Sequence, residues 1–323
     1  MRKIFFFLLF LTEMLCADLY DPWFVGPFLI PSSVNMPFGH PSVEASVTAF
    51  NFYGIYDAEW KMKRTERVVS INPFLYVQLP FSEKLGMDFY VSSLTNFQGG
   101  KNVTYLQDST VYLGYQLSVD DQKSWVPNCR IQIQEVFPTG NYQDFKPEKA
   151  AISSTGLGSF QTGPTIVLQK VFNARGHPLS LEWSAGYFFP ASVQVKGFNT
   201  YGGGYGTKGK VRPGQSFLGY FSGEYAFNQR WAFAFDTQFL VRQKCSFSGE
   251  KGTVTASTGV AAGSGVTGAA TVGLPSLFQL SFAPELEYHF SAKAGLLGGL
   301  WFSLAGRNAQ AFSSAFIAYS YIF

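Results

Sequence analysis

Apolar and polar residues alternate with a period of two along much of this 323-residue chain. In the last segment, 310–323, Phe323, Tyr321 and Tyr319 fall on one face and Ser320 falls on the other. A period of two is typical of a β-strand whose two faces have different surroundings. The pattern therefore predicts strands rather than helices.

The same alternation recurs along the chain and predicts twelve strands. Most are long enough for the roughly 9–11 residues that a tilted strand needs to cross a bilayer. Alternation alone does not distinguish a membrane barrel from a soluble sandwich, whose aromatic face would point into a core. The predicted strands are Ser42–Tyr53, Val68–Leu79, Leu85–Asn96, Ser109–Ser118, Cys129–Phe137, Phe160–Phe172, Leu179–Phe189, Gln215–Phe227, Trp231–Cys245, Leu277–Phe290, Ala294–Ala305 and Ala309–Phe323.

The connections between these strands are short and long in turn along most of the chain. Four short ones share a pattern of Phe, a small polar residue, any residue and a base, at 81–84, 172–175, 227–230 and 290–293. Outer-membrane barrels have short periplasmic turns and long outer loops on alternate hairpins. The rhythm predicts an all-β fold: a transmembrane antiparallel β-barrel of about 12 strands with short periplasmic turns and long extracellular loops.

Composition supports a membrane location. Hydrophobic residues make up 46% of the chain and charged residues 14%, against about 25% charged residues in a typical soluble domain. After the first residues no apolar run is long enough for a spanning helix, and only helices and closed barrels satisfy their backbone in lipid. We therefore expect a protein of the Gram-negative cell outer membrane, in contact with its lipid. The net charge of +3 is too small to indicate a nucleic-acid partner.

Residues 1–17 have the features of a secretory signal peptide. Arg2 and Lys3 precede an apolar core, and the expected cut follows Ala17. Cys16 raises the alternative of a lipoprotein, but Leu15 is too bulky for the usual lipoprotein signal. The barrel is expected to occupy 42–323.

The segment 18–41 is rich in proline and cannot form a helix or a central strand. Two interpretations are open: an irregular periplasmic lead-in, or a plug packed inside the barrel. The plug would bury Trp23, Phe24 and Phe28, which would otherwise be exposed.

Polar residues on the predicted strands are expected to line the lumen, because a charge facing lipid costs about 2–4 kcal/mol at the membrane midplane. Such a lumen is either a water-filled channel or a narrow barrel filled by charge pairs, for instance among Glu224, Asp236, Arg242 and Glu285. The predicted lumen residues are Glu44, Asp88, Arg130, Gln132, Gln134, Gln169, Glu182, Glu224, Asp236, Gln238, Arg242, Glu285, Glu287 and His289.

Large side chains on the same inward face would narrow the lumen. They indicate a path for a solute that is partly apolar. These residues are Tyr76, Tyr112, Phe188, Leu218 and Tyr220.

The sequence gives little support to an enzyme. It contains three histidines, and His289 would lie in the lumen among carboxylates, where a structural role is expected rather than that of a general base. No His/Cys cluster has the spacing of a metal site, and we expect no metal and no cofactor. Cys129 and Cys245 fall at opposite ends of the barrel, so they should stay unpaired.

Two stretches resemble known proteins. The aromatic last strand resembles the closing strand of bacterial outer-membrane barrels, and this resemblance implies recognition of Phe323 by the barrel-assembly machinery. The region 137–241 carries a P-T-G turn, a G-x-G-S, a G-Y strand end, a P-G restart and an E-Y-x-F-x-x-x-W hairpin, in that order. This order resembles the outer-membrane transporters named for the meta-pathway of phenol degradation. The family implies a barrel that passes small, often aromatic, compounds.

We therefore expect an outer-membrane channel or facilitator for the passive passage of small, aromatic or hydrophobic solutes. Its long loops and the segment 23–30 would narrow or gate the path. The alternative is a barrel with a filled lumen whose long loops bind host or matrix partners.

Overall fold

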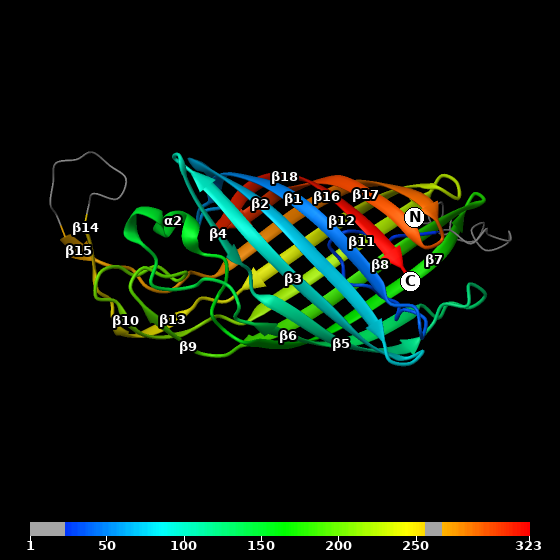
Figure 1. Ribbon diagram of the computed structural model, residues 1–323, viewed down its shortest axis with the longest axis horizontal. Helices are drawn as coiled ribbons and strands as arrows, with labels where there is room; N and C mark the ends of the chain where they lie inside the picture. Colours follow the sequence, from blue (N-terminus) through cyan, green and yellow to red (C-terminus); the bar gives the residue numbers. More distant parts are fainter. Residues whose placement is uncertain (1–22, 256–266) are drawn as a thin grey trace, which may run out of the picture.

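The structure of the protein, a computed structural model, describes residues 23–255 and 267–323. Within them, twelve antiparallel strands form a closed barrel and are tilted against its long axis (Figure 1). The predicted signal peptide, 1–17, lies outside the described residues. The barrel strands are β1 (Ser42–Tyr56), β2 (Met62–Pro80), β3 (Leu85–Gln98), β5 (Ser109–Ser118), β6 (Asn128–Phe137), β7 (Gln161–Ala174), β8 (His177–Pro190), β11 (Ser216–Ala226), β12 (Trp231–Arg242), β16 (Leu277–Ser291), β17 (Ala294–Arg307) and β18 (Ala309–Ile322).

Each predicted strand corresponds to one barrel strand, which confirms the predicted fold class. The strands pair in chain order, and β18 closes the barrel against β1, from Ser42 opposite Ile322 to Tyr56 opposite Ala309. No helix among the described residues is long and apolar enough to cross a membrane.

Short turns lie at one end of the barrel, here called the turn end, together with the C-terminus (Figure 1). The long connections lie at the opposite end, the loop end. Two predicted turns, 290–293 and 172–175, begin later than expected: β16 continues to Ser291, and β7 continues to Ala174, after which the chain turns at Arg175 and Gly176. Their φ values of 59° and 85° are those of a two-residue hairpin turn, whose twist matches that of the flanking strands.

Side chains alternate across the barrel wall. In β12, Ala232, Ala234 and Asp236 are buried, whereas Trp231 and Phe233 are exposed on the outside. Exposed large apolar side chains recur on every side of the barrel. An apolar outer surface around a more polar interior is the inverse of a soluble protein and suits a lipid environment.

At the loop end a second, smaller sheet continues the barrel wall. This rim sheet consists of β9 (Val193–Lys196), β10 (Lys208–Arg212) and β13 (Ser246–Glu250), with β10 in the middle. β9 follows β8, β10 leads into β11 and β13 follows β12. Five further elements complete the described fold: β4 (Lys101–Leu106), η2 (Pro147–Lys149), α2 (Ala150–Ser153), β14 (Thr253–Thr255) and β15 (Thr267–Ala269).

The glycine-rich segment 200–210 packs against the rim sheet. Tyr201 is 1% exposed, and its hydroxyl donates a hydrogen bond to the Leu157 carbonyl at 2.7 Å. Tyr201 packs with Val195 and Val211 of the rim sheet. The loop end therefore carries a cap with its own apolar core.

Cys129 and Cys245 are free and half-buried, as expected. Cys129 is the second residue of β6, at the turn end, and Cys245 follows β12 at the loop end.

Candidate functional site in the barrel lumen

The N-terminal segment lies inside the barrel. The blue chain that precedes β1 is visible within the wall in the turn-end half of Figure 1. We call residues 23–36 the plug segment. Trp23, Phe24 and Phe28 all line a cavity that strands from around the barrel also line. Of the two interpretations left open by the sequence, the structure favours the plug.

Carboxylates hold the backbone of the plug segment. The bonds run from Val25 N to Glu287 Oε2 (3.2 Å), Gly26 N to Glu224 Oε1 (3.1 Å), Phe28 N to Glu285 Oε2 (3.1 Å) and Leu29 N to Asp236 Oδ2 (2.7 Å). Pro27, between them, has no N–H to satisfy. A typical hydrogen bond contributes about 0.5–1.5 kcal/mol net. These four bonds give acceptors to backbone N–H groups that lack the partners of a helix or a strand.

These acceptors come from three adjacent strands, β11, β12 and β16. Glu224 lies beside Glu287, and Asp236 lies beside Glu285. The charge pairs with Arg242 that were expected for a filled lumen are wrong. Arg242 ends β12 at the loop end, and no ion pair of its guanidinium is found in the described residues. The lumen is filled here by backbone, not by salt bridges.

Apolar contacts anchor the deepest part of the plug segment. The Phe28 ring stacks on Phe316 of β18 with a centroid separation of 3.9 Å and lies 5.4 Å from the ring of Phe74. Ile30, which is 7% exposed, packs against Val167 and Tyr220. Aromatic pairs add about 0.5–1.5 kcal/mol beyond the area that they bury. Phe28 is therefore the main side-chain anchor.

The segment then returns toward the turn end. Ser33 Oγ donates to Gln169 Oε1 at 3.0 Å, and Asn35 N donates to Gln116 Oε1 at 2.7 Å. Asn35 Nδ2 reaches the Ser82 carbonyl of the β2–β3 turn at 2.8 Å. The plug segment is thus a loop that rises into the lumen and comes back to begin β1 at the turn end.

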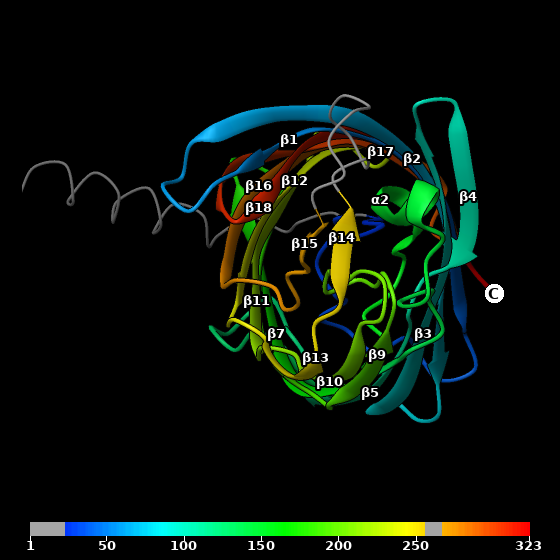
Figure 2. The same ribbon diagram turned by 90° about the vertical axis from the view of Figure 1, so that its left-hand side faces the viewer.

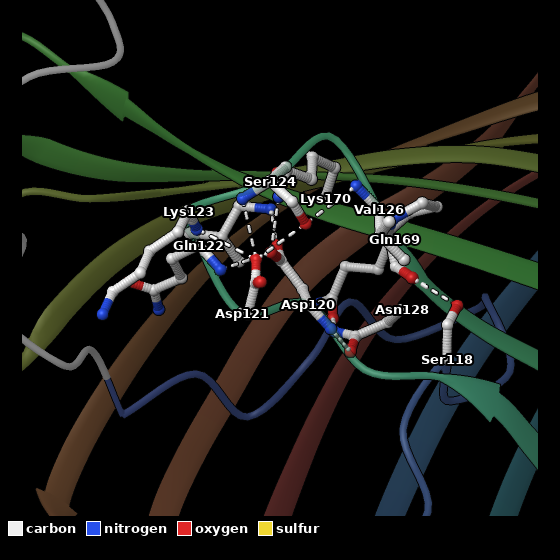
Figure 3. A network of polar contacts seen from close by, with 12 residues as sticks. Ser118, Asp120, Asp121, Gln122, Lys123, Ser124, Val126, Asn128, Gln169 and Lys170 are labelled. Atoms are coloured by element: carbon white, nitrogen blue, oxygen red, sulfur yellow. Dashed lines mark hydrogen bonds and ion pairs between the residues drawn. The ribbon is translucent and has the colours of Figure 1, made fainter.

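Gln169 joins this return to the β5–β6 connection shown in Figure 3. Asn128 Nδ2 donates to Gln169 Oε1 at 2.8 Å, and Lys170 pairs with Asp120 at 2.5 Å. In the same connection, the N–H and hydroxyl of Ser124, with the N–H of Lys123, lower the pKa of Asp121. The β5–β6 connection is thereby ordered beneath the plug segment.

A cavity of about 740 Å³, here called the lumen cavity, runs along the plug segment. It extends from Lys293 at the turn end to Thr110 and Phe188 in the loop-end half. The large inward residues expected to narrow the lumen all line it. Its aromatic lining consists of Phe50, Phe74, Tyr76, Tyr90, Tyr112, Phe188, Tyr220 and Trp301, with Trp23, Phe24 and Phe28 of the plug segment.

One buried ion pair sits in this wall. The Arg130 guanidinium donates to both Asp88 carboxylate oxygens, at 2.9 and 3.1 Å, and the Tyr76 hydroxyl donates to Asp88 at 3.1 Å. Arg130 has room because Gly114 has no Cβ, which would lie 2.4 Å from Arg130 Nε. The cavity wall therefore combines aromatic side chains with fixed polar groups, of which the Arg130–Asp88 pair is one. This combination is typical of small-molecule sites.

The ladder between β7 and β8 contains a proline beside the lumen cavity. Thr162 lies opposite Phe189 and Thr165 opposite Gly186 in one continuous register, and Pro164 between them cannot donate to the ladder. An apolar groove of about 540 Å³ lies at this place on the outer face, and Thr165 and Gly186 line both the groove and the lumen cavity. The groove and the lumen cavity therefore lie on opposite sides of the same part of the wall.

The predicted lumen residues fall on the inner side of the wall with different degrees of burial. Glu44, Gln134, Gln169, Gln238 and Arg242 are half-buried. The sequence did not assign the carboxylates their acceptor role, nor Tyr90 and Trp301 a place in the lining. The fully buried ones are Asp88, Arg130, Gln132, Glu182, Glu224, Asp236, Glu285, Glu287 and His289, the last 3.2 Å from Glu287.

No protein-family model and no curated protein sequence matches this chain. Among solved structures, an outer-membrane channel from Pseudomonas putida F1 is similar at 12% identity, covering 92% of this chain and 100% of that chain, with a TM-score of 0.66. The NanC porin (14% identity, 86% and 98% coverage) and the Pseudomonas putida toluene transporter TodX (12%, 88% and 89%) give TM-scores of 0.41 and 0.39 and carry no argument. The first likeness confirms the fold of an outer-membrane barrel.

Proposed function

We propose that this protein is an outer-membrane channel that passes small, partly apolar or aromatic solutes, with the turn end in the periplasm. The observation that carries the proposal is the lumen cavity, an aromatic-walled space of about 740 Å³ inside a membrane barrel. That volume suits a small molecule. The similar protein from Pseudomonas putida F1 is itself an outer-membrane channel, which agrees with this proposal.

The groove over β7 and β8 supplies a route from the lipid. A solute dissolved in the membrane would meet the apolar groove first, and the wall at Thr165 and Gly186 separates the groove from the lumen cavity. Release into the periplasm would then require movement of the plug segment. Apolar solutes would avoid the polar loop end altogether.

The proposal is tested by equilibrium dialysis of the purified barrel against naphthalene. Arabinose, a small polar solute, serves as the comparison. We expect saturable binding of naphthalene at one site per chain and none of arabinose. Leu218→Asp, which places a charge in the lumen cavity, should abolish binding. Leu106→Asp is the matched control, because Leu106 is 53% exposed on β4 outside the barrel. Equal binding by both variants would contradict the proposal.

A second candidate function is a surface barrel whose loops bind a host or matrix partner. The cap favours it, because its apolar core gives the loop end a fixed shape. A folded barrel that binds no solute and conducts no ions after removal of the plug segment would support this alternative. Insertion through the assembly machinery by Phe323 stays a prediction in either case.

A further inference from the structure

The rim sheet has one apolar and one basic face. Val193, Val195 and Val211 point inward and are at most 4% exposed. The opposite face is exposed throughout, and half of its eight residues are basic. It comprises Gln194, Lys196, Lys208, Lys210, Arg212, Ser246, Ser248 and Glu250.

The positive charge of this face is incompletely balanced. Lys196 lies directly opposite Lys208, and like charges opposite each other destabilise a sheet. Lys196 pairs with Asp144 at 2.8 Å. For Lys208, Lys210 and Arg212, no ion pair is found in residues 23–255 and 267–323. The face therefore favours an anionic partner.

The position of the face identifies the kind of anion. Each rim strand continues a barrel strand, and Figure 2, which looks onto the loop end, shows the rim sheet at the edge of the barrel with α2 and β14 inward of it. Directly below, the barrel wall presents exposed Phe189, Phe217 and Val241 to lipid. The outer surface thus changes from apolar to basic within a few residues, at the height where lipid headgroups begin.

We propose that the outward face of the rim sheet binds the phosphate groups of a phosphorylated glycolipid in the outer leaflet. Ammonium and guanidinium groups donate charge-assisted hydrogen bonds to phosphate, and basic side chains beside a membrane contribute attraction to anionic headgroups that adds up from residue to residue. The basic side chains of the rim sheet lie on a flat face that points away from the barrel. Such a face suits headgroups arranged in a plane, whereas a free phosphate ion would need a pocket. The inference depends on the outer-membrane location and not on solute transport.

The test compares two triple variants of the full-length barrel in detergent. Lys208→Gln, Lys210→Gln and Arg212→Gln remove three charges from the rim sheet. Lys61→Gln, Arg64→Gln and Arg67→Gln remove three exposed charges from the β1–β2 hairpin, also at the loop end. The probe is diphosphoryl lipid A, and binding is measured by native mass spectrometry and by the shift in melting temperature.

We expect the rim variant to bind lipid A about 100-fold more weakly, since each of the three basic groups near an anionic headgroup contributes about fivefold. The hairpin variant should change binding by less than about threefold, and Lys208→Arg with Lys210→Arg should retain it. Lipid A stripped of its phosphates should bind neither protein tightly, and millimolar inorganic phosphate should not compete. Equal losses in both triple variants, unchanged binding in the rim variant, or tight binding of the dephosphorylated lipid would overturn the proposal.

Discussion

The two ends of the barrel are closed by different kinds of contact. At the turn end, the plug segment is held by backbone N–H groups bonded to Glu224, Asp236, Glu285 and Glu287, with Phe28 as the main apolar anchor. At the loop end, the cap is held by a core of rim-sheet valines around buried Tyr201. One closure is mainly polar and the other mainly apolar.

This difference determines which closure can move. When the plug segment leaves, its N–H groups and the carboxylates exchange their bonds for bonds to water, so the net loss per bond is modest. Opening the cap would expose apolar surface at about 25 cal/mol per Å² with no such compensation. We infer that the plug segment is the movable gate and that the cap is a fixed part of the barrel.

Deleting Trp23–Met36 should have the largest effect. Full-length protein should conduct weakly in planar bilayers, and the deletion should give steady ohmic steps of much higher conductance. The opened pore should select cations, because buried carboxylates outnumber the buried guanidinium of Arg130 along its wall. Shortening the β1–β2 connection at 57–61 is the control and should change nothing. A folded deletion variant that stays silent would show that the plug segment is not the gate.

Phe28→Ala should come next. Loss of its stacked partner Phe316 and of its packing should weaken plug docking by about 3 kcal/mol, which raises the open fraction in single-channel recordings about 100-fold. Phe24→Ala is the matched control in the same segment, because no ring contact of Phe24 is found within the described residues. If both variants open equally, the stacking is not what holds the segment.

Glu285→Ala should have a smaller effect. It removes the acceptor of the Phe28 N–H, at a cost of about 1–3 kcal/mol. We expect an open fraction about tenfold higher. Glu44→Ala is the control, because Glu44 lines the lumen cavity but accepts its bond from Ser320 rather than from the plug segment. The comparison fails if Glu44→Ala opens the barrel as much as Glu285→Ala does.

Tyr201→Phe should have the smallest effect and should act on the other closure. It removes the bond to the Leu157 carbonyl and should lower the stability of the cap by about 1 kcal/mol. Hydrogen exchange of the rim-sheet amides measures this change. Conductance should stay as in the unmodified protein; a rise would mean that the cap also gates.

The barrel itself could be predicted from sequence because each strand repeats one local signal. Strand β12, for example, alternates aromatic and small residues from Trp231 onward, and a phenylalanine, Phe81 or Phe227, begins the turn after β2 and after β11. The role of the carboxylates could not, because their partners are backbone N–H groups, which leave no side-chain pattern. The proline-rich segment indicated an irregular chain, and its composition left open whether that chain lies inside the barrel.

The cap could not be predicted from sequence for a related reason. A stretch such as 200–210 has the composition of a flexible loop. Whether this stretch packs depends on its contacts with Leu157 and Val211. Leu157 is distant in the chain, and neither residue belongs to a sequence pattern that would identify the contact. Glycines at 202 and 203, with φ of 104° and 87°, permit the chain reversal beside Tyr201 that a Cβ would strain.

The most direct measurement is disulfide trapping of the plug segment in the lumen. A Cβ built at Gly295 would lie 2.3 Å from Val25 Cγ2, which places Val25→Cys and Gly295→Cys within disulfide range in a protein whose native cysteines are replaced by serine. We predict rapid formation of this disulfide in the folded barrel, low conductance while it is intact, and more frequent openings after reduction. Failure of the pair to cross-link in a folded barrel would contradict the placement of the segment inside the lumen.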